Sequence, residues 1–383
     1  MLLTDRQTDR QTDRQTDRQT DSGFNNKMNI LKALGMMAVI GGHCGVNFLS
    51  GFPVYSFHMP LFMFISGYFF HDKSFRAFIR SKAKHLIAPF LLWNFFFGLV
   101  CTFLRRSDII AFGKDISLQT LLVEPFTSGH QFVFNLPTWF VGTLIEVQIL
   151  YWCLHKLCRG NMKILTLLSG LSYGVSLYLA FHHFYPSHGP WMLAVEKVCF
   201  CLTFYQVGLL YKRFIEKRDS FSITKIVLLV IFNGILMGFI SHDIGFTLSW
   251  MKFPTHKLLL PFAAALSGIY LYMQAAELLK DKISRHSWLG FIGENSFSIM
   301  TLHLFFFWLL NTVFYYLKNF GVFLLRSFNY DQYMHNIFYR ISEHAPMNNV
   351  FYFMAGLLGS CLCVYVWDRY KHLIFNQWKR VVG

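Results

Sequence analysis

Apolar runs of about 20 residues recur along almost the whole chain, and this pattern restricts its possible folds more than any other feature. A helix of that length crosses about 30 Å of hydrocarbon. Only 14% of the 383 residues are charged, against about 25% in a soluble domain. The sequence therefore predicts an all-α integral membrane protein, a bundle of about ten transmembrane helices. The predicted spans are Ile30–Leu49, Phe52–Phe70, Leu86–Leu104, Leu136–Leu154, Ile164–Phe184, Trp191–Tyr211, Ile223–Ile240, Leu258–Leu279, Phe291–Tyr316 and Val350–Trp367.

Basic residues alternate between the connections of these spans. Twenty Lys and Arg side chains fall on the connections after the second, fourth, sixth, eighth and tenth spans, and eight fall on the opposite connections. Because basic loops stay in the cytoplasm, both termini are predicted to be cytoplasmic. The net charge of +15 is then a topology signal, and we expect membrane lipids and no nucleic acid as partners. We expect a disordered tail over residues 1–27, a membrane domain over 28–372 and a short cytoplasmic tail over 373–383.

The first residues are a repeat. From Thr4 to Asp21 the chain spells TDRQ four times and then TD. A repeated GACA tetranucleotide encodes this pattern in every frame, and a change in copy number shifts the frame. The tract thus suggests phase variation, the random switching of expression. Met28 is an alternative start, and the membrane domain is expected to need nothing before it. A wrongly assigned start in an ordinary gene is the other interpretation.

Lys32 and His43 lie in the first predicted span, eleven residues apart. Eleven residues make almost three helical turns, so both side chains share one face, about 16 Å apart along the axis. Ionisable groups inside a membrane span are costly and indicate function by default. The alternative is that Lys32 reaches to the interface and that His43 is a packed, hydrogen-bonded histidine.

The eight cysteines have no spacing typical of a metal or redox site. The pairs Cys199/Cys201 and Cys361/Cys363 lie inside apolar spans, where small buried hydrophobic side chains are expected. We therefore expect no metal.

Five stretches occur in an order that resembles a known family. Residues 30–43 read ILKALGMMAVIGGH, and residues 57–70 read FHMPLFMFISGYFF. A basic loop, residues 78–84, precedes LIAPF; LPTWF opens the fourth span; and IGENS, residues 292–296, leads to His303. From about Asn29 to the last span, the chain resembles the membrane-bound acyltransferase family 3, in its sugar O-acetylase branch (fucose 4-O-acetylase-like). Many members have Arg where this chain has Lys32, which keeps the charge but loses the planar fork of a guanidinium.

The resemblance implies an integral-membrane O-acyltransferase in a bacterial inner membrane. The donor is expected to be acetyl-CoA from the cytoplasm. The acceptor is expected to be a hydroxyl of a cell-surface glycan or of a lipid-linked oligosaccharide: lipopolysaccharide or lipooligosaccharide, capsule or exopolysaccharide. The same enzyme with another acyl group, such as succinyl, is one alternative. A polytopic glycan transporter or flippase is another, although no inverted repeat is evident between the halves.

Site residues follow from the motifs and from the chemistry of acyl transfer. A sugar hydroxyl needs a base, and the unperturbed pKa of histidine suits that role near neutral pH. His43 is predicted to be the base, or to carry the acyl group transiently, and Lys32 on the same helix face is predicted to be a second catalytic residue. Glu146 is expected to orient a histidine or to pair with Lys32 or Lys197. The predicted substrate-binding residues are His58, Ser66, Trp139, Glu146 and His303, and the predicted residues for the phosphates of coenzyme A are Arg76, Arg80, Lys82 and Lys84.

Overall fold

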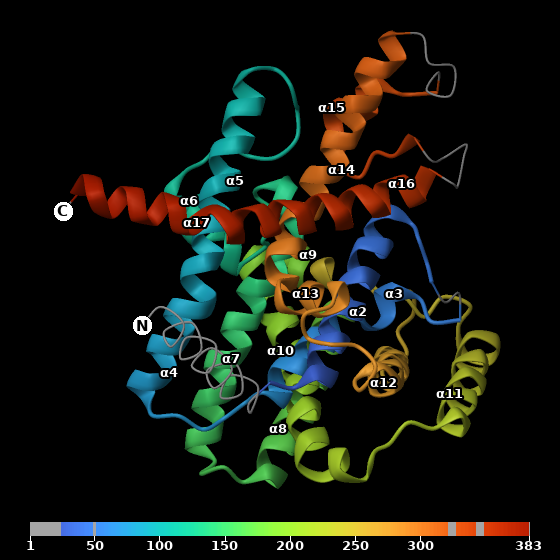
Figure 1. Ribbon diagram of the computed structural model, residues 1–383. Coiled ribbons are helices and arrows are strands. Elements are labelled where there is room, and N and C mark those ends of the chain that lie inside the picture. Colours follow the sequence, from blue (N-terminus) through green and yellow to red (C-terminus); the bar gives the residue numbers. More distant parts are fainter. Residues whose placement is uncertain (1–23, 49–50, 321–326, 342–347, 383) are drawn as a thin grey trace.

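The computed structural model describes residues 24–48, 51–320, 327–341 and 348–382, and these form a helical bundle (Figure 1). The repeat from Thr4 to Asp21 lies outside these residues. The longer helices are α2 (Asn26–Cys44), α3 (Val54–Tyr68), α4 (Phe75–Lys82), α5 (Ala88–Arg106), α7 (Trp139–Leu157), α8 (Met162–Phe181), α10 (Pro190–Leu210), α11 (Ile223–Ile235), α12 (Leu260–Leu279), α14 (Ser296–Asn319) and α17 (Ser360–Val382). The shorter helical segments are η1 (Ala83–Ile87), α6 (Leu118–Leu122), η2 (Glu124–Phe126), η3 (Val133–Thr138), α9 (Phe184–His188), η4 (Tyr211–Ile215), η5 (Glu216–Arg218), η6 (Leu236–Ile240), η7 (Leu248–Trp250), α13 (Trp288–Glu294), α15 (Tyr330–His335), α16 (Asn348–Met354) and η10 (Ala355–Gly359).

Each predicted span contains a helix, and the fold class is confirmed. In the described part of the chain, eight helical segments are long and apolar enough to cross a membrane. The count of ten is not confirmed, because α2 and α3, the first two predicted spans, are not among the eight. Their sequences explain this, since α3 has 15 residues and α2 carries Lys27, Lys32 and His43. The eight apolar segments make the chain a multi-pass membrane protein.

Helix α2 is a core helix. Side chains around its circumference, including Met28, Ile30, Ala33 and Met36, are fully buried. Asn25 caps its N-terminus, because the side-chain oxygen accepts from the Met28 amide at 3.0 Å. Gly45 ends it with φ +73, a left-handed conformation that glycine adopts without strain. Lys27 lies in the first turn of α2 and His43 in its last turn. We call the two ends of this helix the Lys27 end and the His43 end of α2.

Helix α3 packs closely against α10 through two glycines. A Cβ atom at Gly67 would lie 1.8 Å from the Tyr205 carbonyl oxygen, and one at Gly208 would lie 1.9 Å from the Phe64 carbonyl oxygen. The backbones of the two helices thus touch where no side chain fits, as small residues allow in membrane bundles. This contact explains the glycine of the Ser-Gly-Tyr sequence at the end of α3.

Two local expectations are wrong. The basic segment 78–84 was expected as a loop, but α4, η1 and α5 run on as one helical segment from Phe75 to Arg106. Good helix formers such as Arg, Lys and Ala dominate it, which favours the helix. The ninth predicted span is divided at Asn295, so that α13 precedes α14. At the edge of the bundle α11 packs beside α12 and exposes most of its apolar surface (Figure 1).

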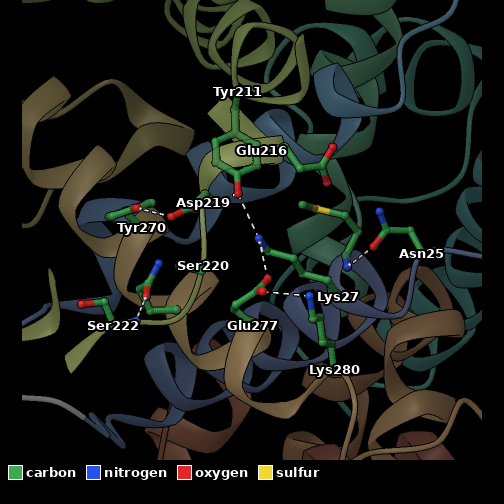
Figure 2. A network of polar contacts seen from close by, with 12 residues as sticks. Asn25, Lys27, Tyr211, Glu216, Asp219, Ser220, Ser222, Tyr270, Glu277 and Lys280 are labelled. Carbon is green, nitrogen blue, oxygen red and sulfur yellow. Dashed lines mark hydrogen bonds and ion pairs between the residues drawn. The ribbon is translucent and has the colours of Figure 1, made fainter. Parts of the chain in front are cut away.

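Polar side chains hold the Lys27 end of α2 in place. The Lys27 ammonium lies 2.9 Å from Glu277 of α12 and 2.9 Å from the Tyr211 hydroxyl, as Figure 2 shows. Glu277 also pairs with Lys280, at 2.8 Å. The two side chains of the Lys27–Glu277 pair are only 8% and 11% exposed. A cation at the start of α2 is therefore matched by a carboxylate of α12 across the bundle.

The same network extends to the segment after α10. Asp219 accepts hydrogen bonds from Lys225 at 2.6 Å, from Tyr270 at 2.6 Å and from Tyr211 at 2.8 Å. Figure 2 shows the bond from Tyr270. Burial alone would raise the pKa of Asp219, but these three donors outweigh it and hold the pKa below its usual value. A cavity of about 480 Å³ adjoins this cluster. Two of the residues that line it, Lys27 and Lys280, are cationic, and four are acidic: Glu216, Asp219, Glu277 and Asp281.

Candidate active site

His43 and His303 meet at the opposite end of α2. His43 lies in the last turn of α2, and its Nδ1 atom is 2.8 Å from Nε2 of His303 in α14. The Nδ1 atom of His303 is in turn 2.8 Å from the Met300 carbonyl oxygen. His303 is fully buried, whereas His43 is partly accessible. The sequence separation of 260 residues is closed by the packing of α14 against α2.

The hydrogen-bond chain fixes the tautomers of both neutral rings. A carbonyl oxygen only accepts, so Nδ1 of His303 carries the proton and its Nε2 is an acceptor. Nδ1 of His43 must then be the donor of the bond between the rings. The proton of His43 is thereby held on Nδ1, and its Nε2 keeps a free lone pair. A neutral histidine in this state can accept a proton at one defined atom, Nε2.

A cavity of about 250 Å³ opens beside this dyad. We call it the His43 pocket. His58 also lines it, and Nδ1 of His58 donates to the Val54 carbonyl oxygen at 2.6 Å, which leaves its Nε2 as an acceptor. The residues that line the pocket are His43, Tyr55, His58, Met59, Leu136, Pro137, Trp139, Thr247, Leu248, Ser249, Trp250 and Phe338.

The other predicted residue of α2, Lys32, shares the His43 face but not the pocket. Among acidic groups, Glu294 of α13 acts on the Lys32 charge, and Glu294 itself pairs with Arg285. The predicted stripe is thus turned toward α13 and α14, with Lys32 near the first helix and His43 bonded to the second. A catalytic role for Lys32 stays a prediction, because about 16 Å of helix separates it from His43.

Of the two predicted residues in the fourth span, one lines the His43 pocket and the other does not. Trp139 lines the His43 pocket. Glu146 does not pair with either lysine in the described part of the chain, although it lies in electrostatic range of Lys197. The Lys197 ammonium instead donates to the Thr127 carbonyl oxygen at 2.7 Å, and it lies 5.2 Å from the centre of the Trp139 ring. A direct ion pair of Glu146 with Lys32 or Lys197 is thus not seen among the described residues, and a role in orienting a histidine or binding a substrate stays a prediction.

Ser66 lies outside the pocket. Its hydroxyl accepts from the Gln148 amide of α7 at 2.7 Å, between α3 and α7. This bond joins two helices that carry pocket residues, His58 and Trp139, at their other ends. The geometry gives Ser66 a place in the frame of the site, and contact with a substrate stays a prediction.

The family comparison agrees with this geometry. The family described as an acyltransferase domain matches residues 25–368. The chain belongs to the acyltransferase 3 family. No curated protein and no solved structure gives a significant match. The protein is thus a membrane acyltransferase, and the match covers α2 with His43 and α14 with His303.

The acyltransferase also has a basic groove. An open cavity of about 840 Å³ is lined by Arg76, Arg80 and Lys84, which follow one another at intervals of four residues, and by His85. Lys82 points elsewhere, because its ammonium lies 5.6 Å from the centre of the Phe78 ring. The unexpected helix of residues 75–106 explains this selection, since positions i, i+4 and i+8 share a helix face and i+6 does not.

These cations lack acidic partners. Within the described residues no carboxylate forms an ion pair with Arg76, Arg80 or Lys84, whereas nearby Asp72 pairs with Lys156 of α7 at 2.5 Å. The hydrogen bond from Lys156 holds the pKa of Asp72 below its usual value. The groove therefore keeps three free cations for an outside anion. It lies near Trp152, whose indole donates to the Lys73 carbonyl oxygen at 3.0 Å.

Sequence reasoning missed the pocket walls outside the helices. Thr247, Leu248, Ser249 and Trp250 come from the connection between α11 and α12, and Phe338 follows α15. Phe338 packs on the His43 ring, with 5.8 Å between ring centres. No periodicity marks these residues. A tryptophan in a predicted outer connection was the one available signal.

Proposed function

We propose that the enzyme transfers an acetyl group from acetyl-CoA to a hydroxyl of a surface glycan or of its lipid-linked precursor. The observation that carries the proposal is that His43 lines a cavity while its bond to His303 occupies Nδ1 and leaves Nε2 free. A neutral imidazole with its lone pair in a pocket suits removal of a proton from an alcohol.

The proposed chemistry uses one base. Nε2 of His43 takes the proton of the acceptor hydroxyl while the oxygen attacks the thioester carbonyl carbon, and the new C–O bond forms. The C–S bond then breaks, and the sulfur leaves with the proton that His43 received. The resulting ester and coenzyme A thiol balance the reaction. His303 keeps the His43 ring in place throughout, as the third member of a triad does elsewhere.

The basic groove supports coenzyme A as the donor. Three unpaired cations on one helix face complement phosphates. By contrast, the cavity at the Lys27 end is lined by more carboxylates than ammonium groups and would repel a polyanion. The groove lies near Trp152, thirteen residues along α7 from Trp139 in the His43 pocket. That length of α7 is about 20 Å, which the extended arm of coenzyme A would suit.

The proposed location follows from the charge pattern. The groove lies on a connection that the positive-inside rule assigns to the cytoplasm, so acetyl-CoA would enter from there and the His43 pocket would face the acceptor on the other side. A bacterial inner membrane provides this arrangement. Phase variation through the repeat would then switch a surface modification, for which lipopolysaccharide or lipooligosaccharide is a suitable acceptor.

The replacement His43→Ala tests the proposal. Wild-type membranes should add one acetyl group, removable by mild alkali, to glycan from cells that lack the gene, and the variant should not. His188→Ala is the matched control, because His188 is an exposed histidine outside the pocket. Full acetylation by His43→Ala at an equal protein level would rule out His43 as the base. Loss of the whole glycan from cells that lack the gene would favour a transporter.

A further inference from the structure

The connection between α11 and α12 forms a fixed wall of the His43 pocket. Thr247 and Lys252 pair across it, with N–O distances of 2.9 and 3.1 Å between their backbones. Between them Leu248–Trp250 forms a 3₁₀ turn, and Met251 takes φ +50 to close it. The amide of Phe246 donates to the Tyr55 carbonyl oxygen at 3.4 Å, which ties this connection to α3. Trp250 is therefore presented to the pocket by a closed turn.

Trp250 is backed by a histidine. The His130 ring stacks on it with 4.1 Å between ring centres and 21° between planes. Both His130 nitrogens are buried, and neither has a hydrogen-bond partner in the described residues. Burial and the nearby Lys197 charge lower the pKa of His130 to about 3, so the ring is neutral at physiological pH. Lys197 also holds the backbone before His130, through Thr127 at 2.7 Å and Ser128 at 3.3 Å.

The pocket itself carries no formal charge. Among the described residues that line it, there is no carboxylate, ammonium or guanidinium group. Its walls are the aromatic rings of Tyr55, Trp139, Trp250 and Phe338, with the hydroxyl groups of Thr247 and Ser249 between them. Arg340 acts electrostatically on His43 and on Tyr55, but it is not among the residues that line the cavity. Aromatic walls with a few neutral polar groups fit a ligand that has apolar C–H faces and a polar edge.

We propose that Trp250 is the stacking platform for the acceptor, and that the pocket selects an uncharged sugar ring over one that carries a carboxylate. This inference rests on the proposed function and names the chemistry of its acceptor. The C–H face of the sugar lies on the indole, whose other side His130 covers, so a ring hydroxyl at the edge reaches Nε2 of His43. A carboxylated sugar would find no cation among the described groups that line this cavity.

The test uses the full-length enzyme in vesicles with two probes, methyl glucoside and methyl glucuronide, in which a carboxylate replaces the hydroxymethyl group at C6. Acetyl-CoA consumption is measured with each probe and without a probe. Wild-type enzyme should turn over the glucoside at least tenfold better than the glucuronide. Trp250→Ala should raise the KM for the glucoside on the order of tenfold, with unchanged KM for acetyl-CoA, and Trp250→Phe should recover most of the loss.

Trp191→Ala is the control, because Trp191 is 61% exposed on α10 and does not line the pocket. Equal or better turnover of the glucuronide overturns the inference, and so does an identical response of Trp250→Ala and wild type to the glucoside. A failure of the proposed function looks different: His43→Ala would then keep its acetyl-CoA consumption, whatever the result at Trp250.

A second inference rests on the residues before Met28. Asn25 caps α2 and donates to the Tyr68 hydroxyl at 2.8 Å. The Asn26 amide donates to the Lys280 carbonyl oxygen at 2.5 Å and to the Ile283 carbonyl oxygen at 2.7 Å. With the buried Lys27–Glu277 pair, three consecutive residues thus bind α2 to α3 and to α12 with the segment that follows it.

We infer that the functional chain begins upstream of Asn25, so that the repeat is read through in every active copy. A chain that starts at Met28 lacks the helix cap and leaves the Glu277 carboxylate without its partner from α2. The expectation that the membrane domain needs nothing before Met28 therefore disagrees with these contacts. A shift of frame in the tract would remove an anchor of the core helix together with everything after it.

Two shortened chains test this inference without any activity measurement. One starts at Met28, and the other starts at residue 23 through Gly23→Met. The second should match the full chain in membrane level and melting temperature, and the first should fall at least severalfold in level. The full chain with Lys27→Ala should lose stability in the same direction. Equal levels and equal melting temperatures for both shortened chains would overturn the inference.

Discussion

The two ends of α2 use polar side chains in opposite ways. At the Lys27 end, ammonium, carboxylate and phenol groups satisfy one another: Lys27 with Glu277 and Tyr211, and Asp219 with three donors (Figure 2). At the His43 end, one bond to His303 orients the ring, and the remaining nitrogen has a cavity beside it. A polar group whose partners are all protein groups stabilises the fold. A polar group that is held from one side only is available to a substrate.

The comparison predicts that removal of Lys27 damages stability and that removal of His43 damages turnover. Lys27→Ala leaves Glu277 with Lys280 alone in a mostly buried site, and breaking a buried ion pair costs about 3–5 kcal/mol of the free energy of unfolding. Thermal unfolding of the solubilised enzyme measures this loss. The double variant Lys27→Met with Glu277→Leu should recover most of it, because two apolar side chains need no partner.

The outcome that contradicts this prediction is a normal melting temperature for Lys27→Ala. The Lys27 end would then tolerate an unpaired carboxylate, and the contrast between the two ends would disappear.

The second prediction concerns His303, which shares features with both ends of α2. It is fully buried, but its partner is His43, which lines the pocket. His303→Ala removes the acceptor that holds the proton of His43 on Nδ1, and loss of that orientation should lower kcat on the order of 100-fold. His303→Gln keeps an acceptor oxygen and should recover part of kcat, with little change in either KM.

A purely structural histidine would behave differently. Both variants would then lose stability and kcat together, and the glutamine would not rescue turnover. Melting temperatures measured beside the rates distinguish the two cases.

The sequence predicted the helical half of this site. Membrane helices have a fixed period, so an ionisable stripe on an apolar run can be read without a structure, and Lys32 and His43 do face α13 and α14. The pocket walls at Trp250 and Phe338 were not predictable in this way, because connections have no period. Their placement depends on tertiary contacts such as the Phe246–Tyr55 bond.

The paired end was missed for another reason. Lys27 precedes the first apolar run and was assigned to a disordered tail, and its partner Glu277 lies 250 residues away. A buried ion pair across such a separation has no local signal. The prediction for the basic segment was wrong for a different reason, because here a local signal existed and was misread. The segment was expected to be a loop, so the helix period that separates Lys82 from Arg76, Arg80 and Lys84 was not considered.

The third prediction uses this difference between neighbouring cations. Arg80→Ala should raise the KM for acetyl-CoA about tenfold, because one charge-assisted contact to phosphate is lost. The increase should shrink at high salt, as screening weakens the remaining contacts of the wild type. Lys82→Ala is the matched control, two residues away on another face, and should change this KM less than about twofold. Equal effects of the two replacements would remove the groove as the donor site.

The smallest expected effect concerns acid. Three donors hold the pKa of Asp219 below its usual value, and its side chain is 2% exposed. The unfolded pKa is about 3.9, so its contribution is fully present above that pH and is lost as pH falls through the lower folded pKa. Asp219→Asn should therefore flatten the decline in melting temperature below about pH 4, a difference worth about 1 kcal/mol. Asp331→Asn, whose side chain is 80% exposed, should leave the decline unchanged. An identical decline in Asp219→Asn and wild type would mean that the donors around Asp219 arrange the backbone without stabilising the charge, and the paired end of α2 would then owe its stability to Lys27 and Glu277 alone.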